Sequence, residues 1–105
     1  MSKASQSSRS LPEDALVALA RLGENLRIAR ERRGESLRAW AERMEISVPT
    51  LQRMEMGDPA VGMGIYATAI WLAGQIDMLS DVAAPATDEH ALEMEILKSR
   101  RRRNP

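Results

Sequence analysis

The side chains with the clearest capacity for hydrogen bonding lie close together in one short segment. The Arg53 guanidinium can donate two parallel hydrogen bonds, and the Gln52 amide can donate one and accept another. Val48, Pro49 and the methyl group of Thr50 place apolar groups beside them. Taken alone, an outward-facing Gln and Arg are most simply the solvated face of a short helix.

Catalytic and metal-binding chemistry has little support in the sequence. His90 is the only histidine and there is no cysteine, so neither a multi-histidine site nor a thiolate metal cluster can be built. Gly57, Gly62 and Gly64 are not followed by the Lys-Ser/Thr pair of a phosphate-binding loop. The acids between residues 77 and 89 lack the spacing of a calcium loop. We therefore expect no enzyme, no cofactor and no metal, and His90 on the solvent side of a helix.

Length and composition bound the organisation of the chain. Its 105 residues suit one small domain with tails, and the absence of cysteine fits a reducing, cytoplasmic location. No run approaches the ~18 apolar residues of a membrane span. We predict a disordered N-terminal arm over residues 1–11, without the apolar region of a signal peptide, a domain over 12–84, and a C-terminal helix with a basic tail over 85–105.

The charges fall into three blocks although they sum to zero. Residues 1–57 carry ten basic and eight acidic side chains. Residues 58–97 carry seven acidic side chains and no basic one, and residues 98–105 carry five basic side chains and no acidic one. This distribution predicts one surface for an anion and another for a basic partner.

Apolar periodicity predicts an all-α chain. A first helix starts at Pro12 and ends near Arg33, where Gly34 supplies a left-handed stop and Gly23 is a candidate kink. A second helix runs from an N-cap at Ser36 to about Met44.

A third helix follows after a tight turn, from an N-cap at Ser47 to Gly57, with Ile46, Leu51 and Met54 anchoring it from below. Gln52 and Arg53 are left facing outward. This helix pair is the main structural signal of the sequence.

Later segments predict three more helices. Two apolar helices are expected over Ile65–Ala73 and Ile76–Ala83, and the first is too apolar to stand exposed because it contains Ile70, Trp71 and Leu72. An amphipathic pattern containing Leu92 and Ile96 then leads into the basic tail. Met44, Met54 and Met56 are expected to fill the core. Met63, Met78 and Met94 are left open as candidates for an adaptable surface.

Two charges occupy positions where apolar residues are expected. Arg30 continues the stripe of Leu22 and Leu26 on the first helix, and Glu55 follows Leu51 on the third. Burying either charge alone would cost several kcal/mol, so pairing them is the economical solution. We predict a structural ion pair that links the first helix to the third.

The segments from Leu22 to Gly34, Ser36 to Met44 and Ser47 to Pro59 together resemble the XRE family of phage-repressor and Cro-like helix-turn-helix proteins, over about residues 22–83. The resemblance implies a five-helix fold, extended here by an N-terminal helical segment and the C-terminal helix. Its second and third helices read DNA, and an Arg and a Glu are bonded where this chain has Arg30 and Glu55. Within the family, the turn Glu55–Pro59 looks most like HipB-type antitoxins paired with HipA-like kinases.

The resemblance also implies which residues contact DNA. Base-reading positions fall on Val48, Pro49, Thr50, Gln52 and Arg53, and positions near the phosphates fall on Ser36, Leu37 and Ser47. At these positions Arg53 can pair with O6 and N7 of guanine, and Gln52 can pair with N6 and N7 of adenine. Val48, Pro49 and the methyl group of Thr50 suit the methyl groups of thymine. Basic groups add electrostatic affinity unless they pair with neighbouring glutamates; the candidates are Arg27, Arg32, Arg33, Arg38, Arg43 and the tail. The chain departs from the family in two places, since many members have Gln in place of Leu37 and Gly in place of Glu45.

Three functions follow in order of preference. The first is a dimeric repressor that binds an operator palindrome, represses its own operon and neutralises a HipA-like Ser/Thr kinase, the toxin of a type II toxin-antitoxin pair. The others are a stand-alone XRE-type repressor, and a protein-interaction adaptor that has lost DNA binding, to which Leu37 and Glu45 point. The homodimer interface is predicted to use apolar residues that exceed the needs of a small core, namely Ile76, Met78, Leu79 and Val82.

Overall fold

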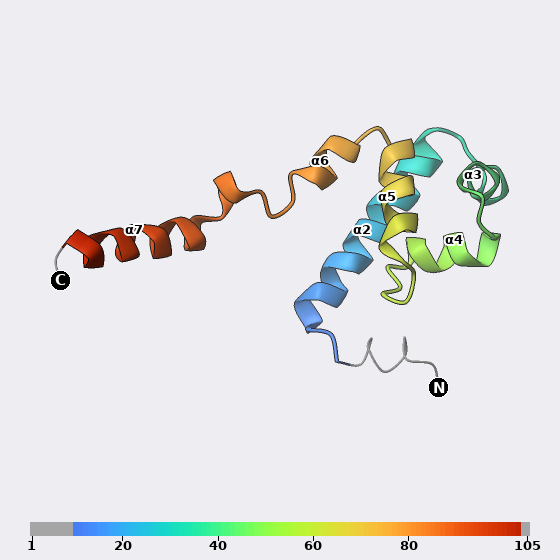
Figure 1. Ribbon diagram of the computed structural model, residues 1–105. Helices are drawn as coiled ribbons and strands as arrows, with labels where there is room; N and C mark the ends of the chain where they lie inside the picture. The colour runs from blue at the N-terminus through green and yellow to red at the C-terminus, as the bar shows by residue number, and fades with distance from the viewer. Residues whose placement is uncertain (1–9, 104–105) are drawn as a thin grey trace.

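The computed structural model describes residues 10–103, and this part of the chain is all-helical, which confirms the predicted class (Figure 1). The first nine residues of the predicted disordered arm lie outside the described range. No helix in the described part is long and apolar enough to cross a membrane. The helices are α2 (Glu13–Arg32), α3 (Leu37–Met44), α4 (Val48–Glu55), α5 (Met63–Leu72), α6 (Ile76–Ser80) and α7 (Glu89–Arg103), with a 3-10 turn at Pro85–Thr87.

Local capping explains where the two short helices begin. The hydroxyl of Ser36 accepts a hydrogen bond from the Ala39 N–H at 3.0 Å, and that of Ser47 accepts one from the Thr50 N–H at 3.2 Å. Each bond satisfies a backbone donor that has no partner inside the helix. Pro49 sits in the first turn of α4, where its missing N–H costs nothing. Both predicted N-caps are therefore confirmed.

Gly23 does not kink the first helix, as the sequence suggested, because α2 runs through it without a break. It provides instead a close helix crossing. A Cβ at Gly23 would lie 2.6 Å from the Glu55 carbonyl oxygen, and one at Gly57 would lie 2.5 Å from the Cα of Ala20. Gly57 also has a φ of 78°, which the turn after α4 requires. The two glycines let the backbones of α2 and the end of α4 touch.

The core lies among α2, α3, α4 and α5. Trp40, Leu51 and Met54 are fully enclosed, and the other buried apolar residues are Leu26, Ala41, Met44, Val61, Tyr66, Ala69 and Ile70. Leu51 and Met54 thus anchor α4 from below as predicted. Most of this core comes from a chain segment of about 45 residues, which keeps α3 and α4 fixed on α2 and α5.

One expectation about the later chain holds in part, and two others are wrong. The first apolar helix is not exposed as a whole, since Ile70 is buried and Leu72 packs against the core. Trp71 is nevertheless 62% exposed, because α5 is apolar all round while only one side of it meets the core. Met56 is 78% exposed because it follows the last turn of α4 and turns away from the core. The helix predicted over Ile76–Ala83 ends at Ser80, and Ala83 adopts a left-handed conformation with φ of 61°.

The C-terminal helix stands apart from the core. Figure 1 shows α7 running away from the other helices, beyond the turns that follow α6. The described part of the basic tail, Arg100–Arg103, belongs to α7 rather than following it. His90 lies on this helix and is exposed, as predicted.

Candidate nucleic-acid interface

The predicted ion pair between the first and third helices is present and buried. The Arg30 Nε donates to Glu55 Oε2 at 2.8 Å and its Nη2 donates to Glu55 Oε1 at 3.0 Å. A third donor, Nη1, reaches the Glu35 carbonyl oxygen at 2.9 Å. The hydrogen bonds to Glu55 raise the pKa of Arg30 against the opposing effect of desolvation. The pair therefore fixes the end of α4 on α2, at the base of the exposed face of α4.

The turn between α3 and α4 is built on a strained residue. Glu45 has φ of 57° and ψ of 41°, in the left-handed region where glycine is preferred. The Ile46 N–H donates to the Ala41 carbonyl oxygen and the Glu45 N–H to that of Glu42, which closes α3 with a Schellman motif. The departure from Gly thus leaves the helix-turn-helix geometry intact.

The outward face of α4 carries the residues that were predicted to read bases. Pro49, Gln52 and Arg53 are exposed, whereas Val48 and Thr50 are half-buried and Val48 packs on the core. Arg53 forms no ion pair within residues 10–103, and its Nη2 lies 3.5 Å from the Thr50 hydroxyl. That hydroxyl in turn lies 2.8 Å from the Ser47 hydroxyl. This chain of contacts leaves most of the Arg53 guanidinium available to a ligand.

Several predicted phosphate contacts are engaged elsewhere in the domain. Arg38 lies 3.7 Å from Glu42, although both side chains are highly exposed. Arg43 bonds Glu35 at 3.1 Å and stacks over the Trp40 ring at 5.3 Å. Exposed pairs of this kind are weak, and an anion such as phosphate can displace the glutamate.

Arg27 is held more firmly, between two glutamates of its own helix. It donates hydrogen bonds to Glu24 and Glu31, which lie one turn to either side. The bonds from Arg27 lower the pKa of Glu24 and raise that of Arg27 itself. Arg27 therefore fits the alternative of a solvated helix face.

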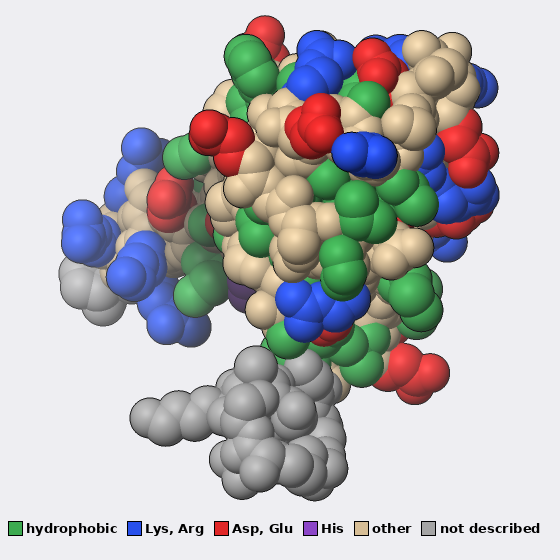
Figure 2. Space-filling model, turned by 90° about the vertical axis from the view of Figure 1, so that its right-hand side faces the viewer, with side chains coloured by type: hydrophobic (Ala, Val, Ile, Leu, Met, Phe, Trp, Pro, Cys, Tyr) green, Lys and Arg blue, Asp and Glu red, His purple; other side chains and the backbone are tan. Residues whose placement is uncertain are grey.

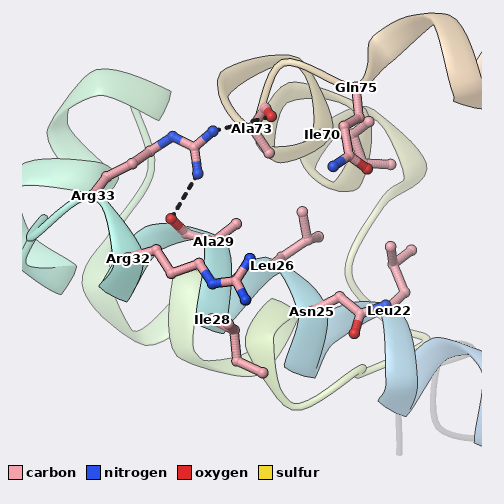
Figure 3. A pocket seen from close by; sticks show the side chains of 10 residues that line it. All are labelled: Leu22, Asn25, Leu26, Ile28, Ala29, Arg32, Arg33, Ile70, Ala73 and Gln75. Carbon is pink, nitrogen blue, oxygen red and sulfur yellow. Dashed lines mark hydrogen bonds between the residues drawn. The ribbon is translucent and has the colours of Figure 1, made fainter.

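Arg33 acts at the end of α5. Its Nη1 donates to the Ala29 carbonyl oxygen at 2.8 Å, and its Nη2 donates to that of Ala73 at 3.2 Å (Figure 3). A cation at this position complements the partial negative charge at a helix C-terminus. Arg33, Ala29 and Ala73 line a hollow of about 480 Å³ between α2 and α5. Arg32 also lines it and has no ion pair within the described range. Arg33 is thus a structural tie, which periodicity alone did not indicate.

The charge on the α3 to α4 unit is balanced. Residues 36–56 hold three Arg and three Glu, and Glu55 is buried. Figure 2 views the molecule from the side of α3 and α4 and shows Lys and Arg interspersed with Asp and Glu, while a separate basic group lies at the left, on α7. Net charge therefore does not mark this face, and its individual donors carry the chemistry.

Sequence reasoning missed Met56 as a neighbour of the exposed face of α4. Met56 and Leu37 line a second hollow of about 530 Å³, together with Gln52 and the Arg30–Glu55 pair. Met56 follows Gln52 by one helical turn, and that spacing was the available signal for placing it beside the reading face. Leu37 is half-buried against the core, so it anchors the start of α3.

The predicted dimer residues are only partly covered in this chain. Met78 and Val82 are 65% and 70% exposed, and Ile76 is 37% exposed. Leu79 is half-buried because it packs on the core. These exposures leave an apolar surface around α6.

The arrangement of two short helices, a tight left-handed turn and an exposed second helix defines a helix-turn-helix domain. Comparison with family models agrees, since residues 21–68 match a model described as a helix-turn-helix domain. This match supports a helix-turn-helix DNA-binding domain, and such domains typically lack catalytic activity. Searches of curated proteins and of solved structures gave no match to the chain.

Proposed function

We propose that this protein is a sequence-specific transcriptional repressor that inserts α4 into the major groove of an operator. The single observation that carries the proposal is the exposed face of α4, where Gln52 and Arg53 project from a helix held rigidly by the buried Arg30–Glu55 pair. A fixed helix supports specificity because base contacts depend on accurate positioning. Two such units in a dimer would read half-sites about 34 Å apart.

Phosphate contacts in this proposal come from the starts of α3 and α4. Ser36 and Ser47 are exposed caps at these helix ends, where free backbone N–H groups favour an anion. Arg38 is the second residue of α3 and its side chain is 87% exposed, so it can exchange Glu42 for a phosphate.

The physiological role that we propose is that of an antitoxin. The resemblance of the Glu55–Pro59 turn to HipB-type proteins supports a HipA-like Ser/Thr kinase as partner and repression of the shared operon. A stand-alone repressor uses the same DNA interface and differs only in lacking the kinase. The adaptor alternative is favoured by one observation, the zero net charge of residues 36–56, which gives little general attraction to DNA.

Selection from a random duplex pool at near-physiological salt tests DNA recognition. We expect a palindrome, and Arg53→Ala should relax one position per half-site by ~1–3 kcal/mol. Arg32→Ala is the matched control, because Arg32 is also exposed and without an ion pair in the described range but lies outside α3 and α4. If no sequence is enriched and the protein binds every duplex equally weakly, the result would favour the adaptor.

Kinase inhibition tests the antitoxin role separately. The purified chain is mixed with a HipA-like kinase encoded beside its gene, and phosphorylation by the kinase is followed. Loss of phosphorylation supports the antitoxin, whereas an operator palindrome without any such kinase or inhibition supports the stand-alone repressor.

A further inference from the structure

The helix α7 is well formed but has no partner within the described chain. The Asp88 carboxylate accepts a hydrogen bond from the Ala91 N–H at 3.1 Å, which caps the helix. None of its 15 residues is buried, and Leu92 and Ile96 are 42% and 53% exposed. Isolated helices of about 12–15 residues are marginal in water, so a helix of this length gains stability chiefly by packing.

Five residues of α7 have the spacing of a coiled-coil seam, and the two in the middle of them are apolar. Glu89, Leu92, Ile96, Ser99 and Arg103 follow one another at alternating intervals of three and four residues, which places them in one row along the helix. The row is apolar in the middle, acidic at its start and basic at its end. Its two ends therefore differ in charge while its centre suits another apolar helix.

The charges of the segment are divided in the same way, and none of them is neutralised locally. Within residues 10–103, no side chain from position 88 onward forms an ion pair. Acid at the start and base at the end favour the helix through its dipole, but they leave both ends strongly charged. The acids are Asp88, Glu89, Glu93 and Glu95, and the bases are Lys98 and Arg100–Arg103.

We infer that α7 binds the α7 of a second copy of the chain in antiparallel orientation. This arrangement places Leu92 of one copy against Ile96 of the other, and the acidic end of each helix beside the basic end of its partner. A parallel pair would bring two acidic ends and two basic ends together, which is destabilising. Charge complementarity therefore selects both the occupant and its direction.

The inference goes beyond DNA recognition, because the contact requires no DNA and uses neither α3 nor α4. It also assigns self-association to a different element from the apolar surface around α6. An acidic protein, a basic protein or nucleic acid would each match only one half of α7. A second copy matches both halves at once.

Charge reversal on the full-length chain provides the first test. E89K/E93K/E95K makes the α7 charges all basic, and K98E/R100E/R101E/R102E makes them mostly acidic. Sedimentation equilibrium without DNA should show the wild type dimerising below roughly 0.1 mM, and each variant alone weakened at least about tenfold. An equimolar mixture of the two should recover the association, which excludes simple unfolding of α7 as the cause.

Salt provides an internal control for the same measurement. Raising the salt from about 0.1 M to 1 M shortens the screening length from about 10 Å to 3 Å, so wild-type association should weaken. A wild type that stays monomeric, or a dimer that is unchanged by both sets of reversals, would overturn the inference. The second outcome would place the dimer contact elsewhere, for example on α6.

Disulfide trapping tests the orientation, and the absence of native cysteine removes background. Glu89→Cys and Ser99→Cys are prepared separately, with one of them mass-labelled, then oxidised alone and as a mixture. In an antiparallel pair with Leu92 opposite Ile96, position 89 faces position 99, so the mixed disulfide should dominate. Predominant same-site disulfides would show a parallel pair and refute the inference. Neither test contains DNA, so both can be interpreted even if the protein fails to bind an operator.

Discussion

Replacing the buried ion pair in parts should show that its two charges depend on each other. We consider Arg30→Met and Glu55→Met, singly and together, because Met keeps much of the length of both side chains. The Arg30 and Glu55 side chains are only 9% and 6% exposed, so either single change leaves one charge enclosed without its counterion. Such a loss costs about 3–5 kcal/mol, a large part of the stability of a small domain.

The double variant should be much less affected than the sum of the single variants. Removing both charges together leaves no unpaired ion, and apolar replacement of a buried pair is often close to neutral. Arg30 also donates to the Glu35 carbonyl oxygen, so a residual cost of about 1 kcal/mol is expected from that lost bond. The coupling between the two sites should therefore exceed about 2 kcal/mol.

Urea unfolding followed by far-UV circular dichroism measures these free energies, with an osmolyte added if a single variant is partly unfolded. Arg27→Met is the matched control, because Arg27 lies on the same helix and bonds two glutamates at the surface. It should remain close to the wild type. Additive effects of Arg30→Met and Glu55→Met would refute the reasoning, since they would mean that leaving one charge without its partner carries no extra cost.

Three further predictions concern the crossing, the turn and the tyrosine. Gly23→Ala should destabilise the domain by about 1–3 kcal/mol, because the new Cβ meets the backbone at the end of α4, whereas Gly64→Ala has open space and should show no such loss in urea unfolding. Glu45→Gly should stabilise by about 0.5–1 kcal/mol by relieving the left-handed strain, and Glu45→Ala should give no gain; a higher urea midpoint in both would contradict this. Burial, and to a lesser extent the nearby Asp58 carboxylate, raises the pKa of Tyr66 in the folded protein. The contribution of Tyr66 to the free energy of unfolding is therefore complete at a pH below its pKa in the unfolded chain, and it is lost as the pH rises through its pKa in the folded protein. Tyr66→Phe should therefore cost about 0.5–1.5 kcal/mol at pH 8, and the difference from wild type should shrink above about pH 10; a constant difference would argue against it.

Local sequence was sufficient to predict the helix boundaries of the reading unit. The caps at Ser36 and Ser47 and the stop at Gly34 act through hydrogen bonds or backbone angles within a few residues, so they are visible without any tertiary contact. The Arg30–Glu55 pair was also predictable, although it spans 25 positions. Two charges on otherwise apolar stripes leave pairing as the inexpensive solution.

For the predicted DNA-reading residues, the sequence correctly indicated which side chains of α4 are exposed. Period and capping placed Gln52 and Arg53 on the outward face, where the structure has them. The partners of the surrounding arginines were harder to predict from the sequence. Glutamates one turn away were expected, but the contact of Arg33 with the Ala73 carbonyl oxygen depends on how α5 lies against α2.

By itself, then, the sequence determined that the chain is helical, where α3 and α4 begin, where α2 and α3 end, and which two charges must meet. These features follow from short-range bonds and from the cost of burying an unpaired ion. The tertiary structure decided the use of Gly23 as a contact point, the exposure of Trp71 and the isolation of α7. Each of these depends on which side of a helix a distant segment covers. An evenly apolar helix such as α5 carries no periodic signal for that choice.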